Sequence, residues 1–175
     1  MQVLIFNQRS IEEILEVILT IGRIVSAEDK AQKLVDGYKK RLNLLREKSE
    51  KIQNKPRVYF EEWDDPTFSG IRWVSELIEI AGGEDIFANK SHGKLAMERE
   101  IQSSDVIEKN PDVILASWCG KPVDIDSIKK REGWNEITAI KNDRIHEIDS
   151  SIILQPGPAC LTDGLKALEQ LITSK

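Results

Sequence analysis

The chain changes character at residue 56, where it reads Pro56-Arg57-Val58-Tyr59-Phe60-Glu61-Glu62-Trp63. Residues 57–61 form a short, mostly apolar run after a proline, which predicts a buried strand. Similar runs at 113–117 and 144–148 predict two more strands. Helical patterns alternate with them at 73–81, 103–110, 126–131, 134–140 and 158–173. This alternation indicates an α/β fold, with a mostly parallel sheet flanked by helices.

Upstream of residue 56 the sequence predicts a strand and two helices. The apolar run at residues 3–6 is typical of a buried strand. Ser10, with Glu13 three residues on, forms a capping box and opens a helix that is apolar around much of its circumference. Such a helix must be covered on more than one side. Ser26, with Asp29 in the same relation, is expected to open a longer helix that ends near residue 50.

The composition excludes several classes of protein. The chain has 175 residues, 40% of them apolar and 31% charged, which suits one globular domain of ordinary size. No apolar stretch is long enough for a membrane span. A net charge of −5 argues against a general nucleic-acid partner. No basic segment precedes an apolar one at the start, so we expect no secretory signal in the chain as given, and a cytoplasmic location if it is translated as written.

Three loops are the candidate ligand-binding segments, at residues 62–70, 118–122 and 149–158. Each follows a predicted strand, and ligands of open α/β sheets bind just outside the carboxyl ends of the strands. The loop aromatics Trp63, Phe68 and Trp118 indicate a flat apolar ligand or partner, unless each ring folds back to cap the core. Trp73 and Trp134, at helix starts, are interpreted as packing residues.

The sequence offers little support for catalysis or for a metal site. The acidic run Glu61, Glu62, Asp64 and Asp65 has no second acidic cluster in a comparable loop, so hydrogen bonding to a polar ligand or plain solvation is favoured over glycoside hydrolysis. Cys119 has Lys121 close by, but nothing else marks it as a nucleophile.

Cys160 falls in a helix and is expected to be buried. The two cysteines and the two histidines, His92 and His146, show no metal-ligand spacing, and no phosphate-binding loop is present. We therefore expect no catalytic residue, no metal ligand and no resident cofactor.

Several further motifs stand at characteristic distances from one another. After residues 56–63 come Ser69-Gly70, Trp73-Val74-Ser75-Glu76-Leu77-Ile78, Ala81-Gly82-Gly83-Glu84-Asp85-Ile86-Phe87, Asn110-Pro111-Asp112-Val113-Ile114-Leu115, Gly133-Trp134 and Gln155-Pro156-Gly157-Pro158. In this order they resemble the C-terminal lobe of the substrate-binding proteins of metal-chelate ABC importers, which carry cobalamin, iron-siderophores or haem. Residues 60–63, with Trp118-Cys119, are most similar to the cobalamin-binding branch.

The resemblance implies a domain organisation. Members of that family have two α/β lobes joined by a long rigid helix. Residues 1–25 would then be a remnant of the N-terminal lobe (strand plus helix), residues 26–55 the long connecting helix, and residues 56–175 the C-terminal α/β lobe. The rest of the N-terminal lobe would lie outside this chain. The uncovered apolar strand and helix predict self-association into a homo-oligomer.

The resemblance also implies a function: binding of a metal chelate, with cobalamin or another corrinoid as the transported ligand, outside the cytoplasmic membrane. The expected ligand-binding residues are Trp63, Phe68 and Trp118, which would stack on the ligand, Asp64, Asp65 and Ser69, which would hydrogen-bond its rim, and Cys119 and Ile152. An ABC permease would be the partner, although the usual docking acids are missing. The alternatives are a siderophore or haem ligand, a truncated self-associating protein that no longer binds ligand, or a small α/β enzyme.

Overall fold

A five-stranded sheet forms the centre of the molecule, in the order β2-β1-β4-β5, with β3 also paired to β1. The structure is a computed structural model and describes residues 3–174. The parallel pairs join β1 (Arg57–Asp64) to β3 (Glu84–Asp85) and β4 (Val113–Ala116), and β4 to β5 (Ile145–Glu147). Only β2 (Thr67–Ser69) is antiparallel among the described strands. The predicted mostly parallel α/β sheet is confirmed.

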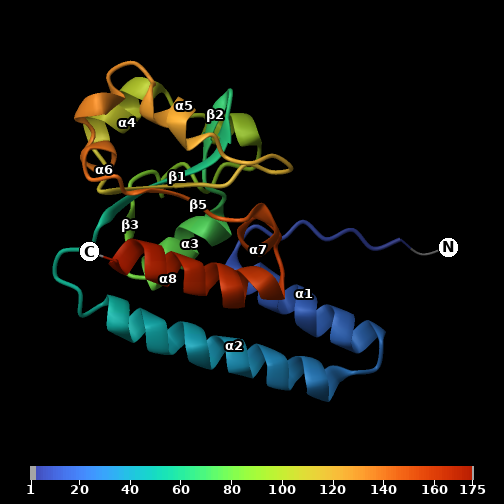
Figure 1. The fold of residues 1–175 in the computed structure, drawn as a ribbon. Helices are drawn as coiled ribbons and strands as arrows, with labels where there is room; N and C mark the ends of the chain where they lie inside the picture. Colours follow the sequence, from blue (N-terminus) through green and yellow to red (C-terminus); the bar gives the residue numbers. More distant parts are fainter. Residues whose placement is uncertain (1–2, 175) are drawn as a thin grey trace.

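Helices cover both faces of this sheet (Figure 1). On one face lie α1 (Ile11–Ile24), α2 (Glu28–Ser49), α3 (Arg72–Ile80) and α8 (Leu165–Thr173). On the other lie α4 (Ser103–Lys109), α5 (Ile125–Lys129), the turn η2 (Trp134–Glu136) and α6 (Thr138–Lys141). Successive strand residues point to opposite faces, so both faces of each central strand must be apolar. Hence Phe60 packs in one core and Tyr59 in the other.

The C-terminal helical segment runs from residue 158 to 173, as predicted, with an irregularity in its middle. Its turn η3 (Cys160–Gly164) is a π-helix, and α7 (Ser150–Ile153) packs directly against it. Gly164 permits this contact, because a Cβ there would lie 2.3 Å from the carbonyl oxygen of Ile152. One further short helical turn among the described residues, η1 (Ala96–Arg99), lies beside β2.

The prediction of a buried strand at residues 3–6 is wrong. The segment is irregular, and Ile5 is 88% exposed. In the described part of the chain no strand pairs with it, and an isolated extended segment without a partner gains neither ladder hydrogen bonds nor burial. The apolar side chains of this segment therefore stay exposed to solvent.

The two predicted helix starts have different outcomes. At α1 the capping box is confirmed: the Ser10 hydroxyl accepts from the Glu13 N–H at 3.2 Å, and the Glu13 carboxylate accepts from the Ser10 N–H at 3.2 Å. At α2 the predicted cap is wrong, because Ser26 has φ +52° and the helix starts after Ala27 without a side-chain cap. Ser26 is used instead in the tight reversal between α1 and α2, where the Ala27 N–H donates to the Gly22 carbonyl at 2.7 Å.

The segment 62–70, expected to be a loop, is mostly a hairpin. Strand β1 continues to Asp64 and pairs with β2, with Trp63 opposite Phe68 and Asp64 opposite Thr67. The Thr67 hydroxyl donates to the Asp64 carbonyl at 2.9 Å, which closes the turn. The register of this pair shifts between Glu61 and Trp63, so the segment shows no strict alternation of apolar and polar side chains that would have predicted the hairpin.

Candidate functional site

The three candidate loops meet at one edge of the sheet. Strands β1, β4 and β5 are parallel, so their carboxyl ends lie at the same edge. Two open hollows lie there. One, of about 580 Å³, is lined by Trp118, by residues 120–122 and by Glu147, Asp149 and Ser150. The other, of about 880 Å³, is lined by Asp64, by Trp118 and by residues 121–127. Both hollows therefore lie at the edge where the candidate loops meet.

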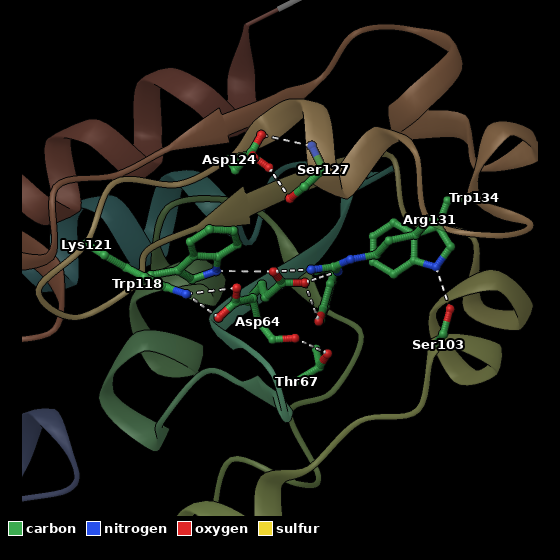
Figure 2. A network of polar contacts seen from close by, with 11 residues as sticks. Asp64, Thr67, Ser103, Trp118, Lys121, Asp124, Ser127, Arg131 and Trp134 are labelled. Carbon is green, nitrogen blue, oxygen red and sulfur yellow. Dashed lines mark hydrogen bonds and ion pairs between the residues drawn. The ribbon is translucent and has the colours of Figure 1, made fainter.

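A network of buried charged and polar side chains lies beneath this edge, on its interior side (Figure 2). Glu61 is fully buried, and its carboxylate accepts two hydrogen bonds from Arg131, at 2.5 and 2.9 Å. It also accepts from the Tyr59 hydroxyl at 3.1 Å and from the Trp118 indole N–H at 3.2 Å. A buried carboxylate is tolerated only when it is paired and hydrogen-bonded in this way. The network fixes the orientation of Trp118.

The network also fixes its own protonation states. Burial, and then the charge of Glu61, raise the pKa of Tyr59 well above 10, so the phenol remains a hydrogen-bond donor. Burial opposes the charge of Arg131, but the hydrogen bonds and charge of Glu61 outweigh it and raise the pKa of Arg131. The guanidinium also lies 4.6 Å from the centre of the Trp134 ring. Trp134 is buried, as predicted for a packing residue.

Trp63, Asp64 and Trp118 gather around the ammonium group of Lys121. The Lys121 Nζ lies 2.8 and 2.9 Å from the two Asp64 carboxylate oxygens. It also lies 4.6 Å from the Trp63 ring centre and 4.8 Å from that of Trp118. The Trp63 indole N–H donates to the Asp65 carbonyl at 3.1 Å, which holds the half-buried ring at the tip of the hairpin. The structure thus brings three of the expected site residues together.

Two of the expected residues serve the scaffold instead. Ser69 is only 1% exposed, and its hydroxyl donates to the Arg99 carbonyl at 3.2 Å, so in this structure the hydroxyl is turned to the protein interior. The Arg99 guanidinium in turn pairs with Glu62 at 2.7 and 2.8 Å. Ile152 is partly buried and packs against the core that contains α3 and α8.

The remaining expected residues differ in accessibility. Trp118 is only 4% exposed, so its ring caps the core in this structure, as in the alternative that the loop aromatics fold back onto the protein. Phe68 is half-buried beside Trp63, whereas Asp65 and Cys119 are exposed. Trp63, Asp64, Asp65, Phe68 and Cys119 are therefore the expected residues whose side chains reach the surface at this edge.

Sequence reasoning missed Glu61, Arg131 and Lys121. A charged residue at the end of an apolar strand was the available signal for Glu61, because such a group must find a partner. Nothing in the local pattern marks Arg131, which comes from the segment that follows α5. Lys121 was noticed only as a neighbour of Cys119, although it stands in the same loop as Trp118.

Carboxylates outnumber cations around the two hollows. Asp64, Asp124, Asp126, Glu147 and Asp149 contribute to their lining, against a single described cation, Lys121. A hydrogen bond from the Ser151 N–H, at 2.8 Å, lowers the pKa of Asp149, which is therefore ionised at neutral pH. An edge of this kind accepts hydrogen bonds from amide or ammonium groups and repels carboxylates.

Two further findings concern residues 3–174. No three His, Cys, Asp or Glu side chains gather there in a way that could hold a metal ion. No helix in this part of the chain has both the length and the apolar character needed to cross a membrane.

Comparison with known proteins places the chain in a family. The profile of the family described as periplasmic binding protein matches residues 1–152. The chain belongs to this family. The resemblance seen in the sequence motifs is confirmed at that level, and the family is one of solute-binding transport proteins.

Individual periplasmic binding proteins are similar along nearly the whole chain. The ABC transporter substrate-binding lipoprotein YvrC of Bacillus subtilis (strain 168) is 28% identical over 171 residues, which are 95% of this chain and 52% of that protein. A vitamin B12-binding protein of Vibrio parahaemolyticus is 24% identical over 168 residues, 95% of this chain and 58% of that protein. The chain thus spans about half the length of the curated relatives it matches.

A solved structure of the same kind matches the fold. The structure described as that of a possible iron-binding (periplasmic solute-binding) protein from Staphylococcus epidermidis ATCC 12228 has a TM-score of 0.79 and 26% identity, covering 96% of this chain and 64% of that chain. The sheet and helices of this chain are therefore those of a two-lobed periplasmic binding protein.

Proposed function

We propose that this chain binds a metal chelate, most favourably cobalamin or another corrinoid, as part of the solute-binding component of an ABC importer. The observation that carries the proposal is the half-buried Trp63 ring at the carboxyl edge of the sheet, with carboxylates beside it. Stacking on a flat apolar face needs such a ring. The name of the Vibrio parahaemolyticus relative supports the same ligand class.

The chemistry of the edge favours a corrinoid over the other chelates. A corrin ring carries amide side chains, whose N–H groups donate to carboxylates such as Asp64 and Asp65. Haem and carboxylate siderophores carry anionic groups, which the acidic lining repels. No covalent step is involved, so the site is one of recognition, with Phe68 and Cys119 as further surface contacts.

The domain assignment is part of the proposal. Residues 1–25 belong to an N-terminal lobe, residues 26–55 are the connecting helix, and residues 56–175 are the C-terminal lobe. The 22-residue helix α2 and the share of each relative that the chain covers support this division. A complete site would lie between two lobes, so this chain alone should bind its ligand more weakly than a two-lobed relative does.

The proposed partners are an ABC permease and a second copy of the chain, on the extracytoplasmic side where the family works. Self-association is supported by the exposed apolar side chains of the N-terminal segment and of the end of α1, such as Ile5, Ile24 and Val25. Light scattering at several protein concentrations tests it: a mass that stays at 19.9 kDa throughout would exclude the dimer.

Equilibrium dialysis tests the ligand class. The purified chain is dialysed against cyanocobalamin, haemin and a ferric hydroxamate in parallel, and the bound chelate is measured by its visible absorption. Saturable binding of cyanocobalamin, tighter than that of the other two, is the expected result. Tighter binding of haemin or of the hydroxamate, or no saturable binding of any chelate by the folded chain, would refute the proposal.

A further inference from the structure

The Lys121 ammonium group lies against the rings of Trp63 and Trp118. It is within 5 Å of the centres of two indole rings, at 4.6 Å from Trp63 and 4.8 Å from Trp118, and it is also bound to Asp64. Atoms stacked on an aromatic face lie about 3.5–4 Å from it. The ammonium therefore fills the layer next to both rings.

The Lys121 side chain is free to leave this position. It is 41% exposed, and its loop contains Gly120 at φ +80°, where no neighbouring atom would contact a Cβ. Ion pairs and cation–π contacts at such exposed sites are individually weak. A ligand that makes good contacts can therefore displace the ammonium at a small cost.

We propose that Lys121 is a specificity-determining residue. A neutral, amide-bearing ligand displaces its ammonium group from Trp63 and Asp64, whereas a carboxylate-bearing ligand pairs with the ammonium. The inference rests on the proposed function of the same edge. Displacement frees the Asp64 carboxylate, which accepts an amide N–H of the ligand in exchange for the ammonium. A carboxylate-bearing ligand instead pairs with the ammonium, the single described cation among the residues that line the two hollows.

The consequence is an effect of opposite sign for the two classes of ligand. While the Lys121 ammonium covers the rings, a neutral ligand cannot stack on them. Its apparent affinity is therefore its intrinsic affinity multiplied by the fraction of molecules in which the rings are uncovered. Replacing the ammonium by an apolar end removes that competition. The same replacement removes an attractive charge for an anionic ligand, whose affinity falls.

The test uses the variant Lys121→Met, which keeps the length of the side chain, and titrates it with cyanocobalamin and with haemin. Cyanocobalamin should bind about fivefold more tightly than to the unmodified chain, which corresponds to about 1 kcal/mol, and haemin more weakly. Lys141→Met is the matched control, because Lys141 is also exposed and ion-paired, with Glu136 at 2.6 Å, and takes no part in lining the hollows. Near-ultraviolet circular dichroism checks that both variants keep the fold.

Each outcome bears on the inference. Tighter binding of cyanocobalamin by Lys121→Met than by the unmodified chain, with a loss for haemin, supports it. If the unmodified chain binds cyanocobalamin and the variant binds it equally or less tightly, or if both ligands gain together, the role of Lys121 is overturned while the proposed function stands. If neither protein binds cyanocobalamin, the proposed function and the inference fail together.

Discussion

Replacement of Arg131 by methionine should destabilise the chain strongly. Glu61 is fully buried, and Arg131 supplies two of the four hydrogen bonds that its carboxylate accepts. Removing one partner of a buried pair costs about 3–5 kcal/mol, because the other charge stays buried. Tyr59 and Trp118 still donate to the carboxylate, so we expect the lower end, about 3 kcal/mol.

Urea unfolding, followed by far-ultraviolet circular dichroism, measures this loss. In a chain of this size, about 3 kcal/mol should also lower the melting temperature by roughly 6–12 °C. The double variant Glu61→Gln with Arg131→Met removes both charges and should recover at least half of the loss, since replacing a whole buried pair is far less costly than halving it. Lys141→Met, at an exposed ion pair, should leave the unfolding midpoint unchanged.

The reasoning would be refuted if Arg131→Met unfolded at the same urea concentration as the unmodified chain. It would also fail if the double variant were less stable than Arg131→Met, since the loss would then not come from an unpaired Glu61 charge. Because Glu61 also holds the Trp118 indole at 3.2 Å, Arg131→Met should in addition change the tryptophan near-ultraviolet spectrum.

Three further predictions follow from packing and ionisation. Gly164→Ala should cost about 1–3 kcal/mol in urea unfolding, because its Cβ would lie 2.3 Å from a carbonyl oxygen of α7, whereas Gly157→Ala, with no atom within 4 Å, should be neutral; equal stabilities would contradict the packing at η3. A thiol reagent should label the exposed Cys119 quickly and Cys160 only on unfolding, because burial raises the pKa of the Cys160 thiol and shields it; rapid labelling of both thiols would exclude this. Burial, and then the charge of Arg144, lower the pKa of His146 below 6.5. The unfolded chain therefore binds the proton first, and the free energy of unfolding should fall as the pH drops through the range just below 6.5. The urea midpoint of His146→Gln should lack this pH dependence, and the same pH dependence in the variant and the unmodified chain would refute the prediction.

The parts of the fold that depend on local pattern could be predicted from the sequence. The apolar runs of β1, β4 and β5 and the capping box at Ser10 carry their own signals, because burial on both faces and a satisfied helix start are properties of a few neighbouring residues. The edge at which the loops meet followed from the direction of the strands alone.

The predictions failed where contacts between distant parts of the chain determine the local structure. The run at residues 3–6 has the composition of a strand but no partner among the described residues, and Ser26 has the composition of a cap but lies in a reversal that requires φ +52°. In the site, Trp118 has the expected position and a different role, because Glu61 and Arg131 hold it inward. A pairing between residues 61 and 131 leaves no trace in the local pattern.

The central claim, that the edge around Trp63 binds a flat metal chelate, is tested most directly by titrating the chain with cyanocobalamin while following tryptophan fluorescence. The unmodified chain should show saturable quenching, Trp63→Phe should keep it, and Trp63→Ala should weaken binding tenfold or more, as expected for loss of a stacked aromatic anchor. An unchanged binding curve in Trp63→Ala, or no quenching of the folded, unmodified chain at any ligand concentration, would contradict the account.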